Sequence, residues 1–140
     1  MRATLLAVGK AKQPLADVHA HYLKLLDAPR RLPLQVVEVK SDDALAPRIP
    51  ADAHAVALEA GGRAMTSEAW AGWLDERRLA ARDLCLMLGG PHGLSPEAVE
   101  RSNESLSLGP QTIAHQLARA VLLEQLFRAT KILAGEPYHY

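Results

Sequence analysis

The residues of this sequence that could do chemistry gather in its last quarter, on a predicted helix and the short tail behind it. His115 and Arg119 lie four residues apart and would share one face of that helix. Glu124, Arg128 and Lys131 follow on a face about 180° away. An imidazole beside a guanidinium could move a proton and bind an anion. Spacing alone favours a solvated edge with an ion pair, so both interpretations stay open at this point.

Three turns that carry glycine follow predicted strands, where ligands bind in open α/β sheets. They are EAGG after residues 54–59, GGPHG after residues 83–88 and GPQTI after residues 105–108. Each turn can bring bare backbone against a ligand, or it can simply let the chain reverse. Backbone amides and small apolar side chains would suit a largely neutral group, such as adenine with a thioether chain.

Several common kinds of site are missing from the sequence. No GxGxxG opens a helix and no GxxxxGK[ST] occurs, which disfavours the usual dinucleotide and nucleoside triphosphate sites. No His, Cys or carboxylate cluster has metal-ligand spacing, so we expect no metal. The single cysteine, Cys85, lies in an apolar run typical of a buried strand, and it excludes disulfides within the chain.

The charge composition of the chain limits the kinds of partner that we expect it to bind. The 140 residues carry 16 Lys or Arg and 16 Asp or Glu, a net charge of zero that is unusual for a protein that grips nucleic acid mainly through phosphates. Residues 1–31 nevertheless carry six Lys or Arg against two Asp, so a basic patch could contact an anionic partner, although a solvated helix face explains it as well. We expect a single domain over residues 1–140, with no signal peptide and no membrane span, and therefore a cytoplasmic protein.

Alternation of strands and helices predicts the fold that would position these residues. We expect strands at residues 2–8, 34–39, 54–59, 83–88 and 105–108, which favours α/β with a mainly parallel sheet and helices on both faces. The helix over residues 114–134 is apolar around most of its circumference, so we expect it to have partners on several sides, including a second subunit.

Four local expectations accompany this fold. Residues 40–53, with three acids and two prolines, are expected to form an exposed loop. Gly61 and Gly62 are expected to turn the chain tightly after the third strand, and Ser67 to cap the next helix. The tryptophans of that helix should be core residues. The buried stripe of the first helix is expected at Leu15, Val18, Tyr22 and Leu25, with His19 at its edge.

Four blocks of the sequence resemble a known family. They are LLAVGKAK at residues 5–12, VALEAGG at 56–62, LMLGGPHGLSPE at 86–97 and SLSLGPQTIAHQLARAVLLEQLFRATKILAGEPYHY at 105–140. They look like the bacterial ribosomal RNA large subunit methyltransferase H family, of the SPOUT class, and the resemblance spans nearly the whole chain. It implies a parallel α/β domain with a SPOUT-type C-terminal trefoil knot, assembled as a homodimer.

The resemblance also implies an activity. It is the methylation of N3 of a pseudouridine in 23S ribosomal RNA, near the decoding centre and on assembled ribosomes, with S-adenosylmethionine as methyl donor. Such a transfer needs alignment, removal of the N3 proton and a cation for the resulting anion, and it needs no metal.

Two sets of site residues follow from the resemblance. The cofactor contacts carried over are Leu58, Gly89, Leu108, Gly109, Pro110, Gln111, Thr112 and Ile113. The candidate bases or orienting groups are His115, Tyr138 and His139, and the candidate anion stabilisers are Arg119 and Arg128.

The sequence departs from the family pattern in three regions. Residues 40–53 are shorter than usual. Gly109 and Pro110 replace a Ser and a bulkier residue, and Ala114 stands where a Pro often precedes the His. The sequence ends at Tyr140 where a basic residue is usual. Two alternatives therefore stay open: a SPOUT enzyme acting on another RNA, and a non-catalytic ribosome-binding protein.

Overall fold

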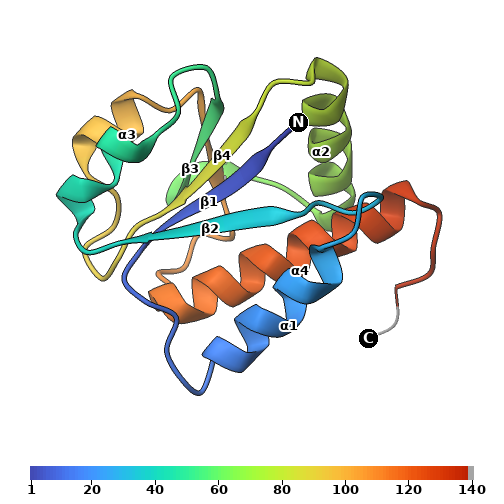
Figure 1. Cartoon of the computed structure of the whole chain (residues 1–140), viewed down its shortest axis with the longest axis horizontal. Helices are drawn as coiled ribbons and strands as arrows, with labels where there is room; N and C mark the ends of the chain where they lie inside the picture. The colour runs from blue at the N-terminus through green and yellow to red at the C-terminus, as the bar shows by residue number, and fades with distance from the viewer. Residues whose placement is uncertain (139–140) are drawn as a thin grey trace.

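A five-stranded parallel sheet forms the centre of the computed structural model, which describes residues 1–138 (Figure 1). Its strands are β1 (Ala3–Val8), β2 (Leu34–Val39), β3 (His54–Ala64), β4 (Leu84–Leu88) and β5 (Glu104–Ser107). They lie in the order β2-β1-β4-β3-β5, and each of these neighbouring pairs is parallel. The predicted α/β class and parallel sheet are confirmed, while the trefoil knot stays a prediction.

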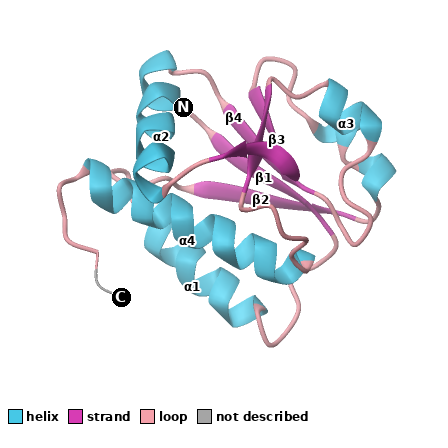
Figure 2. Ribbon diagram, turned by 180° about the vertical axis from the view of Figure 1, so that it is seen from behind, coloured by secondary structure: helices cyan, strands magenta, loops and turns pink. Residues whose placement is uncertain are grey.

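Helical segments cover both faces of this sheet (Figure 2). One face is covered by α1 (Ala16–Leu26), α2 (Ser67–Ala80) and α4 (His115–Leu133). The other face is covered by α3 (Pro96–Glu100) and by the two 3-10 turns η1 (Asp42–Ala44) and η2 (Ala46–Arg48). The heavier layer therefore includes the long C-terminal helix.

The central strand β4 shows why its sequence is a continuous apolar run. Leu84, Leu86 and Leu88 belong to the core beneath α1, α2 and α4, whereas Cys85 and Met87 belong to the core beneath η1, η2 and α3. Successive strand side chains point to opposite faces, so a strand covered on both sides has no place for a polar residue. Burial raises the pKa of the Cys85 thiol to about 11, which keeps it protonated and unreactive.

The buried stripe predicted for α1 is wrong in two of its residues. Val18 and Leu25 are each 37% exposed, whereas His19 and Leu26 are buried. Two stripes of helical spacing compete in this segment, and spacing alone cannot choose between them. The packing of α1 on α4 selects the stripe that contains His19, whose Nε2 donates a hydrogen bond to the Gln116 carbonyl at 2.8 Å.

The exposed loop predicted at residues 40–53 is also wrong. Its acidic residues are exposed or partly exposed. Leu45, Ala46, Ile49 and Ala53, however, are buried in the core beneath η1, η2 and α3. The reason is that this face of the sheet must be covered, and the five residues of α3 are too few to do so. The residues in and around the two 3-10 turns supply the missing apolar side chains.

No tight turn forms at Gly61 and Gly62, because β3 continues to Ala64 after a shift in its register against β5. A Cβ on Gly62 would lie 2.7 Å from the carbonyl carbon of Leu106, so this glycine permits close approach of two backbones. The cap of α2 is Thr66, one residue before the predicted Ser67, and its hydroxyl accepts a hydrogen bond from an amide of the first turn.

Candidate functional site

The predicted long helix is confirmed as α4, and it carries most of the candidate site. Its 19 residues span about 28 Å at ~1.5 Å per residue. Gly135 ends it with a positive φ of 68°, as the sequence predicts. The face formed by Leu122, Leu123 and Leu126 is fully buried against the sheet. The middle of the helix is therefore packed firmly against the sheet.

A cavity of about 300 Å³ opens between the β3–α2 connection, the end of β5 and the middle of α4. It is lined by Ala64, Met65, Thr66, Ser67, Trp70, Ser107, Leu108, Gly109, Val121 and Gln125. The lining offers hydroxyl, amide and apolar groups and no charged side chain, and its volume is at the lower end for small-molecule sites. An uncharged wall of this kind suits a planar neutral ring and an apolar chain.

Two of the predicted cofactor contacts, Leu108 and Gly109, line this cavity, and the other six do not. Ser107, which the sequence prediction omits, lies beside them and is 3% exposed. Its hydroxyl accepts a hydrogen bond from the Gly109 amide at 3.0 Å. The same hydroxyl lies within hydrogen-bond distance of the carbonyl oxygens of Ala60 and Gly109. It thus joins the end of β5 to β3, and a serine two residues before the glycine of a turn is the signal that could have identified it.

The turn GGPHG folds back on itself. Gly90 forms a bridge with Gly93, and a Cβ on Gly89 would lie 2.3 Å from the Gly93 carbonyl carbon. Close packing inside the turn is therefore sufficient reason for a glycine at position 89. Its predicted contact with a cofactor stays a prediction.

A chain of hydrogen bonds runs from the cavity wall to the tail. The Ser67 hydroxyl donates to the Gln125 amide oxygen at 2.8 Å, and the Gln125 amide nitrogen donates to Glu124 at 2.7 Å. Glu124 also accepts from Arg128, at 3.0 and 2.5 Å, and from the Tyr138 hydroxyl at 2.7 Å. The structure therefore brings Arg128 and Tyr138 together, within one helical turn of the cavity wall.

The environment of Tyr138 restricts its chemistry. The Arg128 guanidinium lies over the Tyr138 ring, 3.7 Å from its centre. Burial, and then the hydrogen bond to Glu124, raise the pKa of Tyr138 well above its ordinary range. A phenol held protonated in this way is a hydrogen-bond donor at neutral pH and a poor general base, so the arrangement favours an orienting role.

Arg119 lies in a different environment, at the N-terminal half of α4. Its side chain is 3% exposed, and it donates to Glu38 at 2.7 Å and to the Gly9 carbonyl at 3.1 Å. Burial would raise the pKa of Glu38, but hydrogen bonds from Arg119 and the Ala11 amide outweigh it and hold that pKa below its ordinary value. The guanidinium thus ties α4 to the ends of β1 and β2, a contact that spacing gave no reason to expect.

His115 begins α4 and is partly buried. It lies thirteen residues before Arg128, about 20 Å along the helix axis. The next residue, Gln116, accepts from the Lys12 amide at 2.9 Å and donates to the Lys10 carbonyl at 2.9 Å, so it fixes the turn after β1. His139 lies outside the described residues. The catalytic roles of His115, Arg119, Arg128, Tyr138 and His139 therefore stay predictions.

Metal-binding groups and membrane-spanning helices are both absent from residues 1–138. Within residues 1–138, no group of three or more His, Cys, Asp or Glu side chains is arranged to hold a metal ion. Among the helices of these residues, none combines the length and the apolar character needed to cross a membrane.

Comparison with known proteins identifies relatives along the whole chain. Residues 1–139 match the model of a family described as predicted SPOUT methyltransferase. A protein of Gemmatimonas aurantiaca named ribosomal RNA large subunit methyltransferase H is 42% identical over 153 residues, covering 99% of each chain. Its namesake from Rubrobacter xylanophilus is 40% identical over 157 residues, covering 99% of this chain and 98% of the relative.

Solved structures share the fold at low sequence identity. A probable methylase family protein from Haemophilus influenzae matches with a TM-score of 0.60 and 11% identity, over 99% of this chain and 70% of the other. The SpoU methyltransferase AviRb from Streptomyces viridochromogenes, solved with the cofactor AdoMet, matches with a TM-score of 0.54 and 13% identity, over 96% of this chain and 58% of the other.

Proposed function

Because the chain belongs to the SPOUT methyltransferase family, in its ribosomal RNA large subunit methyltransferase H branch, we propose that it methylates N3 of a pseudouridine in 23S ribosomal RNA. Relatives that carry this name match it from end to end, which supports the coarser activity of a large-subunit ribosomal RNA methyltransferase. The pseudouridine, its N3 atom and the assembled ribosome as substrate rest on the family resemblance. A ribosomal substrate would place the protein in the cytoplasm.

The observation that carries the proposal is the uncharged cavity beside Leu108 and Gly109. S-adenosylmethionine would supply a methyl group activated by its sulfonium, and the cavity residues fit its neutral adenine and apolar chain. Bare backbone at Gly109 and the hydroxyls of Thr66 and Ser67 would hold its polar edges. A wall without cations also avoids repelling a positively charged donor.

Arg128 and Tyr138 would act on the acceptor base. Arg128, fixed by Glu124 beneath the Tyr138 ring, would stabilise the anion formed when N3 loses its proton. Because Tyr138 is held protonated, it would orient the base, and proton removal would fall to His115 or His139.

One copy of the chain does not bring all these groups to one nucleobase. His115 and Arg128 are separated by about 20 Å along a straight helix, several times the reach of a hydrogen bond. A second copy would allow a site made from the N-terminal half of one α4 and the tail of the other. The exposed Leu117 on α4 gives that contact an apolar residue. We therefore include a homodimer in the proposal.

Two measurements test the activity. Calorimetry should detect S-adenosylmethionine binding to the purified chain, and labelled methyl groups should enter large-subunit RNA of ribosomes from cells that lack the endogenous activity. Absence of cofactor binding would overturn the proposal. Cofactor binding without transfer would indicate a non-catalytic ribosome-binding protein, and label in another RNA would indicate a different target.

The shared site has its own test. A variant with His115→Ala should remove the proposed base at the start of α4, and a variant with Arg128→Ala should remove the tail cation. Each alone should be inactive, whereas an equal mixture after subunit exchange should regain about a quarter of wild-type activity, because half the dimers then contain one complete site. Inactivity of the exchanged mixture would contradict a site built from two chains.

A further inference from the structure

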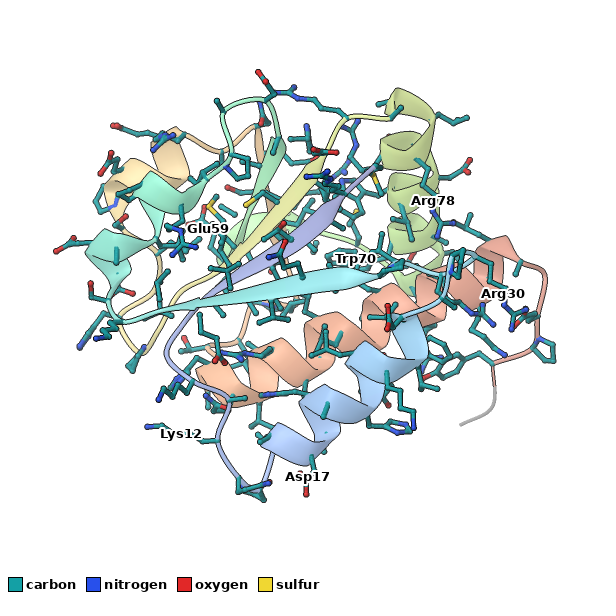
Figure 3. All side chains as sticks on the ribbon, viewed as in Figure 1. Lys12, Asp17, Arg30, Glu59, Trp70 and Arg78 are labelled. Atoms are coloured by element: carbon teal, nitrogen blue, oxygen red, sulfur yellow. The ribbon has the colours of Figure 1, made fainter. Side chains whose placement is uncertain are left out.

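Four cations gather where the tail leaves α4, in a group that the methyl-transfer site does not use. Arg30, Arg31 and Lys131 contact the Glu136 carboxylate at 3.1, 2.6 and 3.0 Å. Arg78, at the end of α2, donates a hydrogen bond to the Arg31 carbonyl oxygen. We call Arg30, Arg31, Arg78 and Lys131 the basic cluster; Figure 3 shows Arg30 and Arg78 on the side of the molecule where α2 and the end of α4 lie.

Ordinary structural roles explain only part of the basic cluster. Arg78 and Lys131 lie in the last turns of their helices, where cations are favoured by the helix dipole. Arg30 and Arg31 lie in the connection between α1 and β2 and belong to neither helix. One cation is enough to anchor one carboxylate, and three surround Glu136. The local charge is therefore strongly positive in a chain whose net charge is zero.

Arg31 shows that the basic cluster has unused hydrogen-bonding capacity. Its side chain is 6% exposed, yet its Nη1 has no hydrogen-bond partner among residues 1–138. Its guanidinium also lies 5.5 Å from the centre of the Phe127 ring, so it is held in place. A buried guanidinium nitrogen without an acceptor is costly, and an incoming oxyanion would remove that cost.

A cavity adjoins the same residues. It has a volume of about 250 Å³ and is lined by Met1, Pro29, Arg31, Leu32, Pro33, Arg78 and Ala81. Two of these residues are arginines and none is acidic. A guanidinium presents a planar fork of donors that matches a phosphate group in two parallel hydrogen bonds.

We propose that the basic cluster is a docking site for a backbone phosphate of the ribosomal RNA, outside the methyl-transfer site. The inference rests on the proposed function for the identity of the RNA. Glu136 keeps the three cations together when no phosphate is present, and the surplus positive charge takes up the phosphate when the protein meets the ribosome. One such local contact orients a chain of zero net charge without giving it general affinity for nucleic acid.

Arg30→Ala gives the cleanest test, because this side chain is 72% exposed and Arg31 and Lys131 would still hold Glu136. Binding to assembled ribosomes is measured over a range of salt concentrations without cofactor. We expect roughly tenfold weaker binding at low salt. We also expect the slope of log K against log salt to become shallower by about 1, the value for one lost phosphate contact.

Two matched variants separate charge from position. Arg30→Lys keeps the charge and should keep the wild-type slope. Arg48→Ala removes an exposed arginine from η2, which covers the opposite face of the sheet, and should change neither affinity nor slope. An unchanged slope in Arg30→Ala, or an equal change in Arg48→Ala, would overturn the inference.

The outcome is distinguishable from failure of the proposed function. Salt-dependent binding that weakens in Arg30→Ala, without methyl transfer by the wild type, would leave the docking site standing and remove the activity. Normal methyl transfer, with the same salt dependence of binding in wild type and Arg30→Ala, would leave the activity standing and remove the docking site.

Discussion

Replacing Arg119 by Met tests whether this arginine chiefly holds α4 in place. The substitution keeps an unbranched side chain about as long as the arginine stem up to Nε but removes two hydrogen bonds, one to Glu38 and one to the Gly9 carbonyl. Hydrogen bonds that involve a charged group contribute about 1.5–3 kcal/mol each. Breaking a fully buried pair costs about 3–5 kcal/mol. The Glu38 side chain is 33% exposed, so water would recover part of that cost, and we expect a loss of about 2–3 kcal/mol.

Thermal unfolding measures this loss. For a chain of this size, 1 kcal/mol corresponds to roughly 4 °C, so the melting temperature of Arg119→Met should fall by about 10 °C. Wild type and variant must be compared at one protein concentration, because a dimer would make the melting temperature depend on it. An unchanged melting temperature together with lost methyl transfer would refute a structural role and support the predicted catalytic one.

The ion pair between Arg119 and Glu38 also makes the stability of the fold depend on pH. The pKa of Glu38 is lowered in the folded protein, so its contribution is present above its unfolded pKa of ~4.3 and is lost as the pH falls through the lower folded value. The difference in stability between wild type and Arg119→Met should therefore be constant near neutral pH and shrink below about pH 4. In a double-mutant cycle, adding Glu38→Gln to Arg119→Met should cost less than Glu38→Gln alone.

Three further predictions follow from single contacts. Gly62→Ala should destabilise the fold by about 1–3 kcal/mol in urea unfolding, because the added Cβ would meet the backbone of β5. Gly61→Ala should not destabilise it, because a Cβ there meets nothing within 4 Å. Equal effects of the two substitutions would contradict the close approach at Gly62. Glu124→Gln should lower kcat for methyl transfer with an unchanged Kd for the cofactor, since it loosens Arg128 without altering the cavity's charge, and an unaltered kcat would remove this positioning role. Hydrogen bonds from Arg31 and Lys131 lower the pKa of Glu136 to about 2. The stability that Glu136 adds to the fold, measured as the difference from Glu136→Gln, should therefore be full above about pH 4.5 and decline toward pH 2. A stability difference that grows on acidification would refute this prediction.

The sheet could be predicted from the sequence because its signal is local. The run that became β4 is apolar on both faces, and few structures other than a doubly covered strand accommodate such a run between a charged segment and a glycine turn. The long helix was equally clear, because Gly135 and Pro137 end a run of good helix formers. The prediction of the buried face of α1 was wrong because apolar residues have helical spacing on two of its faces. Only the packing of α1 against α4 determines which of these faces is buried.

The candidate site was less predictable because its contacts join distant parts of the chain. His115 and Arg119 share a helix face as predicted, but the partner of Arg119 is Glu38, 81 residues away in β2. No spacing rule relates a residue in a strand to one in a helix that follows three other strands. The group of Glu124 and Arg128 was predictable as an i, i+4 pair, whereas its link through Gln125 to the cavity was not.

One helix connects the proposed methyl-transfer site to the basic cluster. The first turn of α4 fixes the turn after β1 through Gln116, and its middle forms a wall of the cavity through Val121. Its last turns carry Arg128 and Lys131, and Lys131 is one of the cations around Glu136. A rigid helix cannot shift at one end alone, so a substitution that moves α4 should alter cofactor binding and RNA docking together. Arg30→Ala, which removes an exposed side chain outside α4, should alter docking alone, and this contrast with Arg119→Met separates loss of a contact from displacement of the helix.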